Sequence, residues 1–153
     1  MALKTSDFFP LIFLVFFTGS HTTPAHSNRD FVFIDYMPNV FRRIRSLMGI
    51  DPTDYLLSLT AEYQLSEIIS PGKSKSFFYF SWDMKYMLKT LFPFEADFLK
   101  KILRHYYEHL CLNHNTMLTR FLGFHAVKTN KGTVRHFVVM NNIFTDNLDI
   151  NLK

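Results

Sequence analysis

Cysteine is nearly absent from the sequence of 153 residues. Cys111 is the only one, which excludes an intramolecular disulfide framework and a zinc site built from several cysteines. A reducing compartment, or a protein indifferent to redox conditions, fits this content best. The sequence also lacks an Asn-x-Ser/Thr glycosylation acceptor, which gives weak support for a cytosolic chain. Its longest uncharged apolar run, residues 8–17, is too short for a transmembrane helix, which needs about 20 apolar residues.

Apolar and aromatic residues are plentiful. Hydrophobic residues make up 48% of the chain and charged ones 20%, which excludes disorder throughout and suits one folded domain. The 18 Phe and 7 Tyr favour a core built on a β-sheet, where aromatic side chains pair across strands. A formal net charge of +4 favours an anionic partner, without choosing among phosphates, nucleic acid and acidic lipid.

The apolar run at residues 8–17 has three interpretations. Lys4 before it and small residues after it give it the shape of a signal-peptide core. Pro10 and the many phenylalanines equally suit a buried strand, and an artefact of the gene model is the third interpretation. Polar residues 20–29 follow as a linker, so residues 1–21 are expected to be an apolar segment separate from the folded domain.

Two short helices are expected next. The first covers residues 38–48, because Pro38 suits the first position of a helix and Gly49 suits the left-handed residue that ends one. A second helix begins at Asp51, whose carboxylate can accept hydrogen bonds from the amides of the first turn. The residues expected on the buried faces are Val40, Phe41, Ile44, Leu47 and Met48 in the first helix and Tyr55, Leu56 and Leu59 in the second.

The remaining pattern predicts two hairpins separated by a helix. The predicted segments are strands 76–81 and 86–91, a helix over 93–109, and strands 121–128 and 133–140. The buried face of this helix is expected to hold Phe98, Leu99, Ile102, Leu103 and Tyr106. The order helix, hairpin, helix, hairpin indicates an α+β domain, an antiparallel sheet with flanking helices.

This order of elements suggests phosphate binding. Residues 70–76 form a small, polar, cationic loop before the first strand of a hairpin, and Lys89 lies on the returning strand. In a protein-kinase-like fold, the amides of such a loop meet phosphate oxygens and the strand lysine neutralises them. From the residues alone, a solvent-facing lysine and an ordinary turn glycine at Gly72 are the simpler explanation.

Two other clusters could carry chemistry. His105 and His109 lie one helical turn apart, near Cys111 and His114; such a pair can bind zinc, but surface histidines are the simpler explanation and we predict no metal site. Six basic residues could attract an anionic membrane or form a solvated face: Arg42, Arg43, Arg45, Lys128, Lys131 and Arg135. Nucleic-acid binding is not expected, because no motif combines stacking aromatics with basic residues.

Four stretches of the sequence carry a family resemblance. They are FVFIDYMPNVFRRIRSLMGIDPTDYLLSL, ISPGKSKSFFYFSWDMKYMLKT, NTMLTRFLGFHAVK and RHFVVMNNIF. In this order they resemble the N-terminal half of the phosphatidylinositol phosphate kinases, closest to the phosphatidylinositol 4-phosphate 5-kinase branch. The resemblance covers residues 22–144 and implies the N-lobe of a protein-kinase-like lipid kinase fold.

The resemblance also implies roles for individual residues. Lys89 would contact the ATP phosphates, and Glu95 on the following helix would be its ion-pair partner. The loop over the phosphates would include Gly72, Lys73, Ser74 and Ser76. The linker whose backbone holds adenine would be Met140, Asn141, Asn142 and Ile143.

The implied reaction transfers the ATP γ-phosphoryl group to the inositol ring, with magnesium. The implied partners are a phosphoinositide lipid in an anionic membrane and a related kinase, in a homo- or hetero-dimer, with no nucleic acid. A cytoplasmic location, peripheral at the inner face of the plasma membrane, follows from the same resemblance. Lys75 departs from it, because it stands where the family usually has a second loop glycine.

Residues 145–153 depart further from the family. They form a divergent tail where the family continues into a second lobe, which carries the catalytic and metal-binding aspartates. We therefore expect no catalytic residue within this chain, a polar role for Asp146 and Asp149, and a truncated kinase that is inactive alone. The alternative is a non-catalytic membrane-binding or interaction module derived from the kinase N-lobe.

Overall fold

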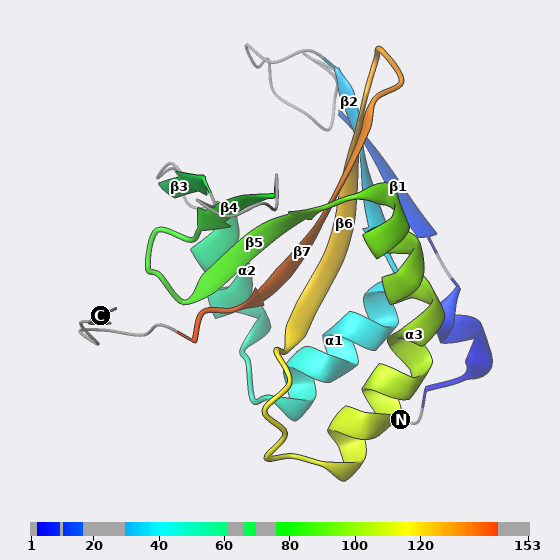
Figure 1. Cartoon of the computed structure of the whole chain (residues 1–153), viewed down its shortest axis with the longest axis vertical. Coiled ribbons are helices and arrows are strands. Elements are labelled where there is room, and N and C mark those ends of the chain that lie inside the picture. Colours follow the sequence, from blue (N-terminus) through cyan, green and yellow to red (C-terminus); the bar gives the residue numbers. More distant parts are fainter. Residues whose placement is uncertain (1–2, 10, 17–29, 61–65, 70–75, 144–153) are drawn as a thin grey trace.

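An antiparallel sheet with helices packed against it forms the protein (Figure 1). The computed structural model describes residues 3–9, 11–16, 30–60, 66–69 and 76–143. The elements in chain order are η1 (Thr5–Phe8), β1 (Leu11–Phe16), β2 (Phe31–Tyr36), α1 (Pro38–Leu47), α2 (Pro52–Thr60), β3 (Ser66–Ile69), β4 (Phe77–Phe80), β5 (Tyr86–Leu91), α3 (Pro93–Leu112), β6 (Phe121–Thr129) and β7 (Val134–Asn141). The predicted α+β class is confirmed, whereas the expected domain boundaries after residues 21 and 144 lie outside the described residues.

The seven strands form one sheet in the order β1-β2-β6-β7-β5-β4-β3. The β6–β7 hairpin lies in the middle, with β2 beside β6 and β5 beside β7. Helix α1 packs on β6 and against α3, and α3 also contacts β5 and β7. The core lies between these two helices and the sheet, and its largest fully buried side chains include Phe41, Ile44, Leu103, Leu110, Leu122 and Phe124.

The helix ends follow the signals in the sequence. Helix α1 begins at Pro38, and beyond its end Gly49 has a φ of +67°, a left-handed conformation that costs glycine nothing because it has no Cβ. Asp51 caps α2 by accepting hydrogen bonds from the amides of Thr53, at 2.8 Å, and Asp54, at 3.1 Å. Helix α3 also begins at a proline, and it continues past the predicted end at residue 109.

The predicted buried faces are mostly confirmed, with two corrections. In α1, three of the expected residues are buried and two half-buried: Val40, Phe41 and Ile44, then Leu47 and Met48. Leu56 and Phe98, however, are 58% and 61% exposed. Leu56 lies off the stripe of Tyr55, Ser58 and Leu59 that α2 turns inward, and Phe98 lies one residue before Leu99 on the inner stripe of α3.

The sheet contains three strands besides those of the two predicted hairpins: β1, β2 and β3. Residues Leu11–Phe16 form β1, which is an edge strand paired with β2, and its side chains are largely exposed rather than buried. Strands β2 and β3 have no counterpart among the predicted elements. No helix within the described ranges is long and apolar enough to span a membrane.

Candidate functional site

An ion pair joins the sheet to α3 at the place where the sequence predicts one. The Nζ of Lys89 on β5 lies 3.1 Å from the Oε1 of Glu95 in the first turn of α3. The other carboxylate oxygen of Glu95 accepts a hydrogen bond from the amide of Phe92 at 2.8 Å, which caps the helix. Because the Lys89 and Glu95 side chains are only 25% and 28% exposed, the ammonium group is held in a fixed and partly desolvated position.

A cavity of about 450 Å³ opens beside this ion pair. Lys89 and Glu95 line it together with mostly apolar side chains of α3, β6 and β7, among them Phe94, Phe98, Ile102, Phe121 and Met140. A positive charge beside apolar walls attracts an anionic group more strongly than a charge in open water does. The ion pair and cavity can therefore hold an anion such as a phosphate, with Glu95 orienting the lysine.

Most of the predicted phosphate loop lies outside the described residues. Gly72, Lys73 and Ser74 belong to this part of the chain, so their contact with phosphate stays a prediction. Ser76 is described, and it is buried immediately before β4. The neighbouring amide of Phe77 donates to the Thr90 hydroxyl at 2.9 Å, which ties the end of the loop to β5.

The predicted adenine linker, residues 140–143, continues from the central strand β7. Met140 and Asn142 are buried, whereas Ile143 is exposed. The amide of Asn141 donates to the Arg120 carbonyl at 3.4 Å, and the amide of Asn142 donates to the Lys85 carbonyl at 2.9 Å. Since these two amides have partners within the protein, donors to a nucleobase would have to come from elsewhere along the linker.

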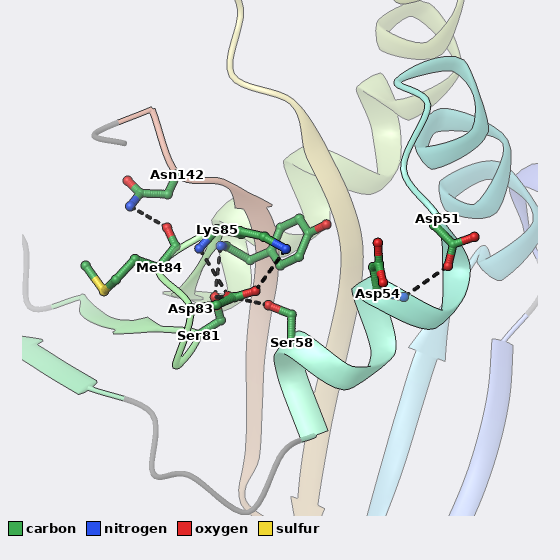
Figure 2. A network of polar contacts seen from close by, with 9 residues as sticks. Asp51, Asp54, Ser58, Ser81, Asp83, Met84, Lys85 and Asn142 are labelled. Carbon is green, nitrogen blue, oxygen red and sulfur yellow. Dashed lines mark hydrogen bonds and ion pairs between the residues drawn. The ribbon is translucent and has the colours of Figure 1, made fainter. Parts of the chain in front are cut away.

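A polar network around Asp83 connects this linker to α2 and to the β4–β5 turn (Figure 2). The Oδ1 of Asp83 accepts hydrogen bonds from the Ser58 hydroxyl at 2.5 Å, the Ser81 hydroxyl at 2.7 Å and the Lys85 amide at 3.2 Å. Its Oδ2 lies 3.4 Å from the Lys85 ammonium. This network was not predicted from the sequence, although an aspartate that bonds the amide two residues later is a known turn signal.

Asp83 is ionised within this network. Burial of its side chain, which is 12% exposed, opposes the charge, but the hydrogen bonds from Ser58, Ser81 and Lys85 outweigh that effect. The pKa of Asp83 is therefore below its ordinary value. A carboxylate with several donors in a largely buried position holds the surrounding backbone more firmly than a neutral hydrogen bond would.

The expected basic cluster is divided by the fold. Arg42 and Arg43 on α1 are exposed. Arg45 instead donates to the Leu122 carbonyl at 2.5 Å and lies over the Tyr55 ring, 4.5 Å from its centroid, so it does not project into solvent. The remaining three, Lys128, Lys131 and Arg135, are exposed at the far tip of the β6–β7 hairpin, well away from α1 (Figure 1).

The histidines near Cys111 have local partners. The Nε2 of His109 lies 2.8 Å from the Thr116 hydroxyl, and exposed His105 lies 3.5 Å from Glu108. In the part of the chain that the structure describes, no group of three or more His, Cys, Asp and Glu residues is placed to hold a metal ion. Asp146 and Asp149 lie outside that part.

Comparison with known proteins gives consistent matches. The sequence model of the family described as phosphatidylinositol-4-phosphate 5-kinase matches residues 59–153. The chain is 51% identical over 133 residues to phosphatidylinositol 4-phosphate 5-kinase its3 of Schizosaccharomyces pombe, a match that covers 87% of this chain and 18% of that protein. It is 44% identical over 126 residues to phosphatidylinositol 4-phosphate 5-kinase 1 of Arabidopsis thaliana, covering 82% of this chain and 17% of the relative.

A third relative extends the comparison to another group of organisms. A probable phosphatidylinositol phosphate kinase of Dictyostelium discoideum is 45% identical over 131 residues, which covers 82% of this chain and 18% of that protein. The chain thus spans about a fifth of the length of the curated relatives it matches. The matched stretch includes the hairpin that carries Lys89 and the helix that carries Glu95. By the family match and by these identities, the chain belongs to the phosphatidylinositol-4-phosphate 5-kinase family.

Proposed function

We propose that this chain provides the ATP-binding lobe of a phosphatidylinositol 4-phosphate 5-kinase. The observation that carries the proposal is the half-buried ion pair between Lys89 and Glu95, at 3.1 Å. It stands where the family resemblance puts the lysine that contacts the ATP phosphates. The names of the relatives, which are phosphatidylinositol 4-phosphate 5-kinases, support the same activity for a protein that contains this lobe.

In this proposal the residues act by position and charge. Lys89 neutralises phosphate oxygens, and Glu95 keeps the ammonium group from turning away when no phosphate is present. ATP, when bound, supplies the γ-phosphoryl group, and magnesium neutralises the charge that develops on it. The charge and position of Lys89 suit a phosphate group. The described residues offer no carboxylate cluster for magnesium, so we assign the metal no ligand among them.

Binding of ATP to the 153-residue chain tests the proposal. Lys89→Met keeps the length of the side chain and removes its charge, and it should weaken ATP binding about tenfold or more in an NMR titration. Lys128→Met, which changes an exposed lysine on β6, is the matched control and should leave the affinity unchanged. Equal affinities for the Lys89 variant and the unaltered chain would contradict the proposal.

We further propose that the 153-residue chain alone transfers no phosphate. The resemblance assigns the catalytic and metal-binding aspartates to a lobe that follows this one. Incubation with radiolabelled ATP and phosphatidylinositol 4-phosphate should therefore yield no bisphosphate. Product above background that disappears with Lys89→Met would overturn this part of the proposal.

A second function is membrane attachment without catalysis, and exposed Arg42 and Arg43 favour it. Both side chains are exposed, and Arg43 also interacts with Tyr107 of α3, so each can approach anionic headgroups without unfolding the core. Such attachment would place the protein at the inner face of the plasma membrane. Salt-dependent co-sedimentation with vesicles tests this function, and a dimer with a related kinase stays a prediction.

A further inference from the structure

The Asp83 network reaches the linker through Asn142. The Asn142 side-chain amide donates to the Met84 carbonyl at 2.7 Å (Figure 2). Its backbone amide donates to the Lys85 carbonyl at 2.9 Å. Asn142 is buried, so neither contact competes freely with water. The position of the linker after β7 is therefore tied to the position of the β4–β5 turn.

The turn itself needs support. Met84 has a φ of +58°, a left-handed conformation that is costly for a residue with a side chain. Asp83 supplies that support, because it bonds the Ser81 hydroxyl before Met84 and the Lys85 amide after it. The Met84 amide also donates to the Ser81 carbonyl at 2.9 Å, which closes the turn.

Ser58 connects the same turn to α2. Its hydroxyl, on a buried side chain, donates to Asp83 from the face of the helix that packs on the sheet. The Asp83 carboxylate thus joins α2 directly to the β4–β5 turn, and the turn in turn accepts the hydrogen bond from Asn142, which follows β7 (Figure 2).

We propose that Asp83 is a positioning residue for nucleotide binding. It holds the β4–β5 turn in its strained conformation, the turn holds Asn142, and Asn142 fixes the linker at residues 140–143. The proposal rests on the proposed function and on the adenine-binding role that the family resemblance implies for this linker. It adds a residue that touches no nucleotide yet sets the affinity for one.

The first measurement is hydrogen exchange at individual amides. Asp83→Asn keeps the shape of the side chain and removes its charge, and it should speed the exchange of the Asn142 amide about tenfold by local opening. The matched control is Asp97→Asn, which removes the charge of an exposed carboxylate that pairs with Lys100 on α3, and should leave this exchange unchanged. Unchanged exchange in the Asp83 variant would overturn the proposal.

The second measurement is ATP affinity in the same samples. Asp83→Asn should weaken ATP binding about fivefold, because an unfixed linker must be ordered when the nucleotide binds. Adding Met84→Gly, which removes the cost of the left-handed turn, should restore much of both the slow exchange and the affinity. A purely stabilising role for Asp83 predicts a lower melting temperature with unchanged ATP affinity, and that outcome would also overturn the proposal.

The outcome for Lys89→Met separates this inference from the proposed function. If that variant and Asp83→Asn both bind ATP more weakly, both proposals are supported. If only the Lys89 variant does so, the positioning role is wrong while the proposed function stands. If the unaltered chain binds no ATP, the proposed function fails, and the exchange of the Asn142 amide alone decides whether Asp83 fixes the linker.

Discussion

Ile44 and Ser46 lie two residues apart on α1 but in opposite surroundings. Ile44 is fully buried in the core, whereas Ser46 is exposed. Ile44→Asp would place a carboxylate without partners among apolar side chains, at a cost of about 4 kcal/mol, which is a large part of the stability of a small domain. Ser46→Asp, on the solvent side, should change the melting temperature little. Equal thermal melts for the two variants would contradict the assigned face of the helix.

His136 makes the stability of the fold depend on pH. Partial burial and the charge of Lys100 lower the pKa of His136, against the opposite effect of Asp97. The folded protein therefore binds this proton less readily than the unfolded chain does. The contribution of neutral His136 to the free energy of unfolding is complete above the ordinary histidine pKa of about 6.5. It is lost as the pH falls through the lowered pKa of the folded state.

Urea unfolding at about pH 7.5 and about pH 5 tests this dependence. His136→Phe removes the titrating group and keeps a ring beside Tyr36 and Phe124, so the variant should lose less stability on acidification. His105→Phe, at an exposed position of α3, should behave as the unaltered protein does. An identical loss in the His136 variant would show that other groups cause the acid sensitivity.

The contacts of some residues could be predicted from the sequence, and those of others could not. The family resemblance implied the pairing of Lys89 with Glu95, and the structure places the two residues, six positions apart on a strand and the helix that follows it, in contact. Arg45 was expected in solvent because its helical position lies off the apolar stripe. Its hydrogen-bond acceptor, the carbonyl of Leu122, is 77 positions away, and local periodicity carries no information about such a contact.

At the scale of elements, residues with a positive φ at turns and helix ends predict opposite effects for two kinds of substitution. Gly49 and Gly132 have φ values of +67° and +82°, and an added Cβ meets nothing nearby at either position. Alanine there should cost about 1 kcal/mol through backbone strain alone. Met84→Gly, which acts in the opposite sense at a φ of +58°, should be neutral or stabilising despite the greater entropy of the unfolded chain. Chemical denaturation of the three variants measures these differences, and a stabilised Gly49→Ala would refute the argument.

The elements that the sequence predicted have strong local signals. Helices α1 and α3 begin at prolines, and both predicted hairpins have apolar strands around polar turns. Strands β2 and β3 were not predicted. Strand β3 has only four residues, and β2 directly precedes a helix, so no hairpin turn marks its end in the sequence. Strand β1 is apolar, yet its side chains are largely exposed, so the hydrophobicity of a strand did not predict its burial here. The Asp83 network was missed because its members come from three elements whose packing is set by the whole fold.

At the scale of the molecule, charge on the surface predicts weak membrane attachment. Vesicles that contain phosphatidylinositol phosphates should bind the chain at low salt, and raised salt should release it, because charges are screened beyond about 8 Å at physiological ionic strength. Replacing Arg42 and Arg43 with alanine should reduce co-sedimentation. Arg45 is left unaltered, since its loss would break the contact with Leu122.

The control for the vesicle experiment uses the opposite end of the protein. Lys128 and Lys131, near the β6–β7 turn, carry the same charge as the two arginines but lie away from α1 (Figure 1). Their double alanine variant should retain more binding than the α1 variant. Equal binding of all variants to neutral vesicles would instead show that exposed apolar side chains, such as those of β1, make the contact.

The strand order has a consequence for synthesis of the protein on the ribosome. The middle of the sheet, β6 and β7, is the last part of it to be translated, whereas the flanking pairs β1–β2 and β4–β5 come earlier. Until residues 121–141 emerge, β2 and β5 each lack the neighbour they have in the finished sheet. The nascent chain therefore exposes unpaired apolar edges until this hairpin has emerged, and during that time the edges can associate with other chains. A pause in translation before this hairpin would prolong that hazard, and a pause after it would not.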